Sequence, residues 1–388
     1  MKKALKFFIA LSLVATMGFS LIACGGNDTA TTDTATTDTA DTEDTTDETD
    51  TTDTAATTTG GGTGTIGVAM PTQDLQRWNQ DGANMKSELE AAGYTVDLQF
   101  AGNDVSVQVS QIENMIAQGV DILVIAAIDG NSLGTPLASA KEAGIPVIAY
   151  DRLIMNSDAV TYYATFDNYL VGQMQGEFIR DKLNLESEPG PFNLEIFTGD
   201  PGDNNAHFFY NGAMGILQPY IDSGVLVVPS GQIDFATVAT ADWSTANAQS
   251  RMEAIIAANY ADGTVLHAVL CSNDSTALGV TNALRANYTA DWPVITGQDC
   301  DIANVLNLIA GYQAMSIFKD TRDLASQVVS MVDAIMAGGQ AEVNDTETYD
   351  NGVLIVPTYL VKPVVVTIDN YQEILIDSGY YTEDQLKG

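Results

Sequence analysis

The sequence predicts an α/β protein of two similar lobes, each built on a parallel sheet flanked by helices. From residue 65 onward, short apolar stretches alternate with helical periodicity, and glycines such as Gly93 and Gly119 end the helices. The strand stretches are apolar on both faces, which is typical of parallel sheets covered by helices. Residues 121–152 and 265–299 repeat one order of strand, polar strand end, helix and Pro-Val-Ile strand. With 388 residues, the chain is long enough for two such lobes.

The expected elements alternate along the chain. Strands are expected at residues 65–70, 95–100, 121–128, 145–150, 161–167, 192–199, 225–233, 265–271, 293–296, 353–356 and 364–368. Helices are expected at residues 77–92, 105–118, 132–142, 172–183, 204–220, 240–258, 275–286 and 320–337. This alternation favours parallel pairing, because parallel strands need a crossover connection between them.

The first residues have the pattern of an export signal. Lys2, Lys3 and Lys6 precede an apolar run at residues 7–23, which ends in Leu-Ile-Ala followed by Cys24. This ending resembles a bacterial lipobox, so we predict a cleaved signal peptide and a lipid anchor on the sulfur of Cys24. An uncleaved anchor helix is the alternative, but a run of about 17 residues is at the lower limit for crossing a bilayer.

A strongly biased segment follows the predicted anchor. Residues 27–64 hold ten acidic residues and no basic, aromatic or large aliphatic residue. Such a segment cannot bury enough apolar surface to offset the entropy of ordering. We therefore expect a disordered tether that its own charge keeps extended.

The composition excludes some partners. With a formal net charge of −36, the surface repels phosphate backbones, so we expect no nucleic acid partner and membrane contact only through the lipid. Besides Cys24, the chain has Cys271 and Cys300, and the sequence leaves open whether they form a disulfide or stay as buried thiols. No metal or cofactor motif stands out, and we expect neither group.

The segment 145–154, Ile-Pro-Val-Ile-Ala-Tyr-Asp-Arg-Leu-Ile, contains the strongest candidates for a binding site. Its apolar strand ends at Asp151 and Arg152, an acid and a base side by side. In open α/β sheets, ligands bind beyond the carboxyl ends of the strands. A carboxylate accepts hydrogen bonds and a guanidinium donates several, which suits a neutral polyhydroxyl ligand. A plain surface ion pair is the alternative interpretation.

A set of short stretches, none distinctive alone, carries a family resemblance. They are 70–78 (MPTQDLQRW), 108–130 (QVSQIENMIAQGVDILVIAAIDG), 147–154 (VIAYDRLI), 162–168 (YYATFDN), 199–206 (GDPGDNNA), 272–279 (SNDSTALG), 296–301 (TGQDCD) and 311–320 (GYQAMSIFKD). In this order they resemble the periplasmic sugar-binding proteins of ABC transporters, above all the multiple-monosaccharide-binding ChvE type and the xylose- and ribose-binding proteins. The resemblance covers nearly all of residues 65–388.

The resemblance implies the type I periplasmic-binding-protein fold. This fold has two Rossmann-like lobes, three hinge crossovers and a ligand cleft between the lobes. The expected parts are residues 1–23 for the signal peptide, 24–64 for the lipidated cysteine and the tether, 65–165 plus 320–352 for the N-terminal lobe, and 166–319 plus 353–388 for the C-terminal lobe. The crossovers are expected near residues 164–166, 318–321 and 353–359.

The resemblance also implies which residues bind a hexose or pentose between the lobes. Arg77 would donate to hydroxyl groups and Trp78 would cover an apolar sugar face. Asp151 and Arg152 match the family's acid–base pair at the ring oxygen and the anomeric hydroxyl. These roles agree with sugar chemistry, since C–H faces pack on aromatic rings and hydroxyl edges need paired donors and acceptors.

Further implied ligands come from later in the chain. They are Asn205, Trp243, Asn273, Asp299 and Lys319, with Gln73, Asp129 and Asp274 as weaker candidates. Asn205 would act as a bidentate amide, although Asn204 could take its place, and Trp243 would stack from the second lobe. Asn273 and Asp299 would bind further hydroxyl groups, and Lys319 would donate from near the hinge.

Structural roles are the alternatives for several of these residues. Trp78 and Trp243 are also compatible with ordinary core or lobe-interface positions. Asn205 and Asn273 stand just before helical runs, where asparagine is a common N-cap. Lys319 is also compatible with a surface lysine.

The sequence favours a binding protein over an enzyme. A glycosidase would need one protonated carboxyl, and Asp151 with Asp299 would be its pair. We expect Arg152 and Lys319 to keep both ionised. No nucleophile or zinc motif stands out, and His267, inside an apolar strand, is expected in the core.

The expected protein is therefore an extracytoplasmic lipoprotein, held on the outer face of the cell membrane. It would capture an aldopentose or aldohexose between two closing lobes and deliver it to the permease of an ABC importer. A sugar sensor that presents its closed form to a chemoreceptor or sensor kinase is the alternative. The sequence does not separate these two, because both use the same closure.

Overall fold

The computed structural model describes residues 62–387, which contain two parallel sheets. The first is six-stranded in the order β11-β5-β4-β3-β1-β2, with every neighbouring pair parallel. Its strands are β1 (Thr65–Met70), β2 (Thr95–Phe100), β3 (Ile122–Ile125), β4 (Val147–Tyr150), β5 (Val160–Phe166) and β11 (Thr358–Val361). Parallel pairing brings the carboxyl ends of these strands to one edge of the sheet.

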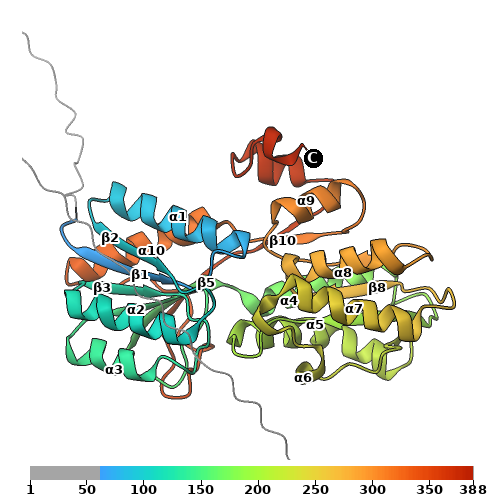
Figure 1. Cartoon of the computed structure of the whole chain (residues 1–388), viewed down its shortest axis with the longest axis horizontal. Coiled ribbons are helices and arrows are strands. Elements are labelled where there is room, and N and C mark those ends of the chain that lie inside the picture. The colour runs from blue at the N-terminus through green and yellow to red at the C-terminus, as the bar shows by residue number, and fades with distance from the viewer. Residues whose placement is uncertain (1–61, 388) are drawn as a thin grey trace, which may run out of the picture. The chain divides into compact units, whose positions relative to one another are not determined.

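Helices cover both faces of this sheet. Figure 1 shows α1 (Gln76–Ala91) and α10 (Thr321–Met336) on one face, and α2 (Val105–Gln118) and α3 (Gly134–Glu142) on the other. The two faces follow from the alternation of side chains along each strand. In β1, Val68 packs with α1 and α10, whereas the next residue, Ala69, packs with α2 and α3.

The second sheet is four-stranded and also parallel, in the order β7-β6-β8-β9. Its strands are β6 (Phe192–Phe197), β7 (Leu226–Val227), β8 (Ala268–Cys271) and β9 (Val294–Ile295). Its helices are α4 (Asn168–Lys182) and α5 (Asn204–Asp222) on one core, and α7 (Thr245–Asn259) and α8 (Asp274–Asn287) on the other. Short helices α6 (Phe235–Val238) and η1 (Ala241–Trp243) lie between α5 and α7 in the chain.

A smaller unit is attached to the second sheet. Strands β10 (Ser316–Phe318) and β12 (Val364–Val366) pair antiparallel, and a bridge between Gln298 and Ile317 links them to the end of β9. Helix α9 (Ile302–Ile309) and the short C-terminal helices η2 (Gln372–Asp377) and η3 (Glu383–Leu386) pack with these strands around one apolar core.

The chain crosses between the two sheets three times. It crosses from β5 to α4, from β10 to α10, and from β11 to β12. The third crossing corrects the boundary expected at residue 353, because β11 pairs with β5 of the first sheet and only β12 belongs with β10. The apolar run in this region offers no periodicity that distinguishes one sheet from the other.

Local differences from the expected elements have simple causes. The strand expected at 225–233 is limited to β7, and the one expected at 353–356 is an irregular loop with a single bridge between Asp350 and Ile355. The helix expected from residue 240 begins at Thr245, because the Ser244 side chain caps it by accepting from the Asn247 amide. Helix α9 and strand β10 were not predicted, since both are shorter than the stretch over which a period is judged.

Two further expectations concern the termini and the cysteines. The signal peptide, the lipid-anchor cysteine and nearly all of the tether lie outside the described residues. Within residues 62–387, no helix is both long and apolar enough to span a bilayer. Cys271 and Cys300 are buried free thiols, so the structure contains no disulfide between them.

Helices α4 and α5 approach so closely that they need glycines. A Cβ added to Gly172 would overlap the carbonyl oxygen of Phe209 and lie 2.9 Å from the amide nitrogen of Ala213. Gly212 faces the α4 backbone in the same way. Both contacts are with backbone atoms, which cannot move aside as a flexible side chain could.

Gly172→Ala should therefore destabilise the fold by roughly 1–3 kcal/mol through overpacking. Gly134→Ala is the matched control, because an added Cβ there meets nothing within 4 Å and removes backbone entropy from the unfolded chain. Urea unfolding monitored by circular dichroism measures both. Equal midpoints for the two variants would contradict the close packing.

Candidate functional site

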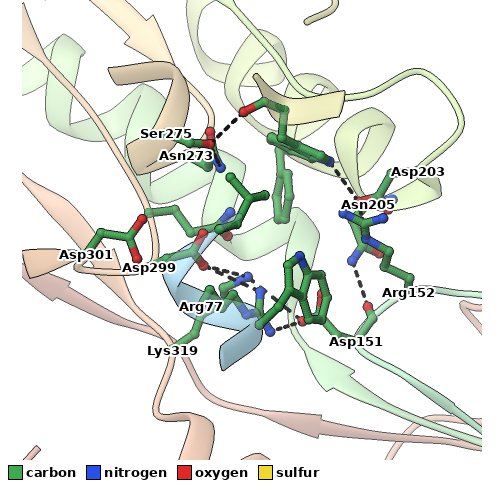
Figure 2. Close-up of a pocket in the computed structure, with 15 residues that line it drawn as sticks. Arg77, Asp151, Arg152, Asp203, Asn205, Asn273, Ser275, Asp299, Asp301 and Lys319 are labelled. Atoms are coloured by element: carbon green, nitrogen blue, oxygen red, sulfur yellow. Dashed lines mark hydrogen bonds and ion pairs between the residues drawn. The ribbon is translucent and has the colours of Figure 1, made fainter. Parts of the chain in front are cut away.

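A pocket lies beyond the carboxyl ends of β1, β4, β6, β8 and β9, between the two sheets (Figure 2). Its lining residues are Leu75, Arg77, Trp78, Asp151, Arg152, Asp203, Asn205, Phe209, Trp243, Asn273, Ser275, Gln298, Asp299, Asp301 and Lys319. The structure thus brings together every main ligand residue that the resemblance implied. Their role in binding stays a prediction.

Arg77, in the first turn of α1, is the centre of the charges in this pocket. Its Nε lies 2.9 Å from Asp81 Oδ2, its Nη2 pairs with Asp151, and its Nη1 lies 3.4 Å from Asp299 Oδ1. Lys319 adds a second cation, with its Nζ 3.1 Å from Asp299 Oδ1 and 3.9 Å from Asp151 Oδ2. All five side chains are almost fully buried.

These cations set the charge of Asp151. Burial acts to raise the pKa of this carboxyl, but Arg77 and Lys319 outweigh burial and hold it below its usual value. Behind it, Asp81 responds differently. Burial raises the pKa of Asp81 to about 6 although Arg77 acts to lower it. The carboxylate that faces the pocket is therefore firmly ionised.

Arg152 forms a second ion pair across the pocket. Its Nε lies 3.0 Å from Asp203 Oδ2, and its Nη1 donates to the carbonyl oxygens of Ala127 and Ile128 at 3.0 and 3.3 Å. The guanidinium carbon lies 5.0 Å from the ring centre of Trp78. Arg152 follows β4 in the first lobe, which is built on the six-stranded sheet. Asp203 caps α5 in the second lobe, which is built on the four-stranded sheet, so this pair also joins the lobes.

Asp151 and Arg152 both line the pocket, as expected, and the alternative of a surface ion pair between them is wrong. Both side chains are buried, and each pairs with a different partner. The physical reason is the backbone at Asp151, which has a φ of 58°. This left-handed turn sends the two neighbouring side chains in different directions.

The two asparagines have different structural roles. Asn205 is in the first turn of α5, whose N-cap is Asp203, so the cap interpretation is wrong for Asn205. Its Nδ2 donates to the carbonyl of Asp151 at 2.7 Å, and its Oδ1 accepts from the Tyr163 hydroxyl at 3.1 Å. Asn273 does cap α8, by accepting from the Thr276 amide, and it also lines the pocket.

The two tryptophans belong to the pocket wall and to the core at once. Trp78 is 3% exposed and packs in the core of the first lobe, while Trp243 is 5% exposed and packs near Phe209. Trp243 Nε1 donates to Asp203 Oδ2 at 3.2 Å. The ring plane of Trp243 lies against Gly199, where any larger residue would overlap it. A core position for these tryptophans therefore does not exclude the predicted contact with a sugar.

The weaker candidates do not line the pocket. Gln73 is exposed, and Asp129 is half-buried and accepts from the Asn131 amide and the Ser132 hydroxyl. Asp274 is buried behind the pocket, where it accepts from Gln313 and Ser316 at 2.8 and 2.9 Å. Among the histidines, His207 is exposed and stacks on Phe235, and His267 is only half-buried.

Sequence reasoning missed several lining residues. They are Leu75, Asp203, Phe209, Ser275, Gln298 and Asp301. Asp203 stands at the N-cap position of a predicted helix, and Asp301 lies two residues after Asp299. Both could have been predicted from the sequence, because both are polar residues that closely follow a predicted strand.

Asp301 is the least compensated acid of the pocket. Its amide donates to Asp274 Oδ2 at 2.9 Å, but its own Oδ1 is buried and accepts no hydrogen bond within residues 62–387. Burial and the nearby Asp299 raise the pKa of Asp301 to about 7, and burial raises that of Asp274 as well. These acids hold protons at a pH where surface carboxyls are ionised.

The pocket is nearly closed in this structure. The volume that the centre of a water molecule can reach inside it is about 30 Å³, room for about two water molecules at roughly 10–15 Å³ each. Within the described residues, no cluster of histidine, cysteine or carboxylate side chains has the arrangement of a metal site.

Asp301→Asn should change how stability depends on pH. The pKa of Asp301 is raised in the folded chain, so its contribution to stability is complete below about pH 4 and is lost as pH rises through about 7. The variant lacks this titration, and at pH 8 it should exceed the wild type in unfolding free energy by roughly 1–3 kcal/mol. The gap should shrink towards pH 4.

Denaturant unfolding at several pH values measures this difference. Asp291→Asn, at an exposed position, is the control, and its curve should run parallel to that of the wild type. A curve for Asp301→Asn that is also parallel would contradict the raised pKa.

Comparisons with known proteins agree with this geometry. The chain matches the family described as a periplasmic binding protein domain over residues 66–340. It is 52% identical over 328 residues to the multiple sugar-binding periplasmic receptor ChvE of Rhizobium radiobacter, with 84% of this chain and 92% of ChvE covered. It is 35% identical over 322 residues to the D-xylose-binding periplasmic protein of Escherichia coli strain K12, with 83% and 92% covered.

Solved structures give the same result. An ABC transporter solute-binding protein from Clostridium phytofermentans, solved with bound β-D-glucose, is 72% identical and superimposes with a TM-score of 0.83. The match covers 83% of this chain and 100% of that one. The predicted two-lobed α/β fold and the resemblance to solute-binding receptors are thereby confirmed. The chain belongs to the periplasmic binding protein family.

Proposed function

We propose that this protein captures a monosaccharide, an aldopentose or aldohexose, between its two lobes and delivers it to an ABC importer. One observation carries the proposal most directly. Charged side chains from both lobes converge on one buried pocket, where Arg77, Arg152 and Lys319 face Asp151, Asp203 and Asp299. The bound glucose of the Clostridium phytofermentans protein and the xylose of the Escherichia coli protein's name support this ligand class.

The pocket offers what a sugar requires. Each sugar hydroxyl both donates and accepts a hydrogen bond. It can therefore accept from an arginine or lysine of the pocket, and it can donate to a carboxylate. Trp78 and Trp243 supply apolar surfaces on which C–H groups pack. Charged hydrogen bonds in a closed site are each worth about 1.5–3 kcal/mol, enough that a few of them support micromolar binding.

The mechanism that follows is hinge closure. In the open form the cross-lobe ion pairs separate and the sugar enters, and in the closed form it bridges the two lobes. The closed surface is then what a permease recognises. A sensor partner would use the same closed form, and no contact in the described residues favours a sensor over a permease.

The site supports binding without catalysis. A glycosidase needs one carboxyl that stays protonated as the acid. Arg77 contacts both Asp151 and Asp299, and Lys319 contacts both as well, so the two acids of the proposed catalytic pair share their counter-charges. Burial and Asp299 raise the pKa of Asp301 to about 7, against the opposing effect of Arg77 and Lys319, and its carboxylate forms no ion pair within the described residues.

Lipid anchoring at Cys24 completes the proposal. The sequence Leu-Ile-Ala-Cys after an apolar run supports cleavage before the cysteine. A tether of small and acidic residues would then connect the anchor on the outer face of the cell membrane to the binding lobes and hold them away from the membrane. Dual acyl chains would make the attachment stable.

A thermal-shift panel of D-glucose, D-xylose, D-galactose, D-glucuronic acid and lactose tests the ligand class, with product analysis of each well. A bound sugar at a hundredfold excess over Kd adds about 2.7 kcal/mol of stability, a rise of several degrees. At least one neutral monosaccharide should stabilise the protein and be recovered unchanged. Stabilisation by lactose alone, or consumption of the sugar, would overturn the proposal.

Asp151→Asn should weaken binding of that monosaccharide about tenfold or more, since it replaces a charged acceptor in the pocket. Asparagine tolerates the left-handed backbone at this position and keeps an oxygen acceptor for Arg77. Asp158→Asn is the control, because Asp158 is an exposed partner of Lys141 and its ion pair is worth little. Isothermal titration calorimetry measures the sugar affinity of both variants. Equal affinities of the two variants would show that Asp151 is not part of the binding site.

Cys24→Ser should release the protein from bacterial membranes without changing its sugar affinity. Detergent-phase partitioning of cell extracts measures the anchoring, with Cys271→Ser as a control that leaves Cys24 in place. Partitioning of Cys24→Ser into the detergent phase would contradict anchoring through this sulfur.

A further inference from the structure

The C-terminal segment, residues 367–387, lies against the second lobe but reaches the first. Figure 1 shows it in red beside α9. Tyr381 packs in the apolar core of this unit together with Cys300, Phe318 and Leu375. Only 2% of Tyr381 is exposed. The ring therefore belongs to the second lobe.

The hydroxyl of Tyr381 joins the two lobes. It donates to the carbonyl of Cys300, in its own lobe, at 2.9 Å. It accepts from Gln76 Nε2 at 2.7 Å and from Gln80 Nε2 at 3.2 Å, and both amides are on α1 of the first lobe. One donated and two accepted bonds use the full hydrogen-bonding capacity of a phenol.

The partners of this hydroxyl are neighbours of the ligand residues. Gln76 directly precedes Arg77, and Cys300 stands between Asp299 and Asp301. Gln76 also accepts from the amide of Ile302 at 3.1 Å, so it contacts the second lobe twice. The hydroxyl thus lies behind the pocket, on the backbone side of the residues that line it.

Tyr380 extends the same contact towards the hinge. Its hydroxyl lies 3.1 Å from Thr321 Oγ1, at the start of α10, and donates to Gln80 Oε1 at 3.3 Å. Its ring packs edge-on against Phe318, with ring centres 4.7 Å apart. The two adjacent tyrosines therefore connect α1, α10 and the second lobe outside the pocket.

We propose that Tyr381 is a positioning residue that latches the two lobes in the closed form from behind the ligand pocket. The proposal rests on the proposed function, since a latch on closure matters for capture between the lobes. Tyr381 does not touch the pocket and acts through Gln76 and the Cys300 carbonyl. Opening the lobes breaks its bonds to α1 and leaves its bond to Cys300 intact.

The latch has a distinct kinetic consequence. Sugar enters the open form, in which the α1 amides bond to water, so losing the latch should not slow association. Sugar leaves only after the latch opens. Losing it should speed dissociation, because a bond made only in the closed form shifts the population towards the open form.

Tyr381→Phe removes the hydroxyl and keeps the ring in its core. We expect the Kd for D-glucose, or for the tightest monosaccharide of the panel, to rise about threefold to tenfold through a faster dissociation rate. The association rate should not fall. Stopped-flow fluorescence of the full chain measures both rates.

Tyr210→Phe is the matched control. It also removes a phenol bond, the half-buried one from Tyr210 to the Ile233 carbonyl at 2.9 Å, but within the second lobe. It should lower stability as Tyr381→Phe does and leave the dissociation rate unchanged. A Gln76→Met, Tyr381→Phe double variant should be less impaired than the sum of its single changes, because both remove one shared bond.

A second measurement separates failure of the latch from failure of the proposed function. Spin labels at Ser87→Cys on α1 and Ala286→Cys at the end of α8, in a Cys24→Ser background, report lobe separation with and without sugar. Tyr381→Phe should shift the distances towards the open form. A wild type that binds no monosaccharide would end the proposed function but not the latch. Equal dissociation rates, or equal distance distributions in wild type and variant, would overturn the latch.

Discussion

The contact of Arg77 with three carboxylates is the interaction on which the pocket depends. One guanidinium meets Asp81 on its own helix, Asp151 at the end of β4 and Asp299 from the other lobe. These acids could not be buried so close together without it, because removing one partner of a buried charge pair costs about 3–5 kcal/mol. The same residue therefore holds the first lobe together at its strand ends and closes it on the second. Lys319, near the hinge, also helps to close the lobes, because it contacts both Asp151 and Asp299.

Two groups of contacts thus hold the lobes together, one inside the pocket and one behind it. Inside, ion pairs and the bond from Asn205 to the Asp151 carbonyl can be exchanged for sugar hydroxyls. Behind, the neutral bonds of Tyr381 and Gln76 involve side chains that do not line this pocket. We propose that the first group gives the site its chemical selectivity and that the second sets how readily the lobes part. A change at Tyr381 or Gln76 would then alter closure of the lobes without altering which ligand the pocket recognises.

Much of the fold followed from local patterns in the sequence, whereas most of the site residues followed from the family resemblance. The βα alternation predicted the parallel sheets, and the polar ends of apolar strands located Asp151 at the end of the first sheet and Asn273 and Asp299 at the end of the second. The pairing of these residues did not follow, because Asp151 meets Arg77 from a distant helix and a left-handed turn sends Arg152 to Asp203. The place of β11 could not be predicted either, since a Val-rich run fits both sheets equally well. Tyr381 meets Gln76 across most of the chain, a contact for which the sequence carries no signal.

The most direct test is a crystal structure of the protein grown with the tightest-binding monosaccharide. The sugar should lie between the lobes, with hydroxyl groups on Asp151, Asp299 and Arg152 and an apolar face on Trp78 or Trp243. Arg77 should keep its bond to Asp81, and the sugar should stand between Arg77 and Asp299. A sugar bound outside this pocket, or one held in it without contact to both lobes, would contradict capture by closure.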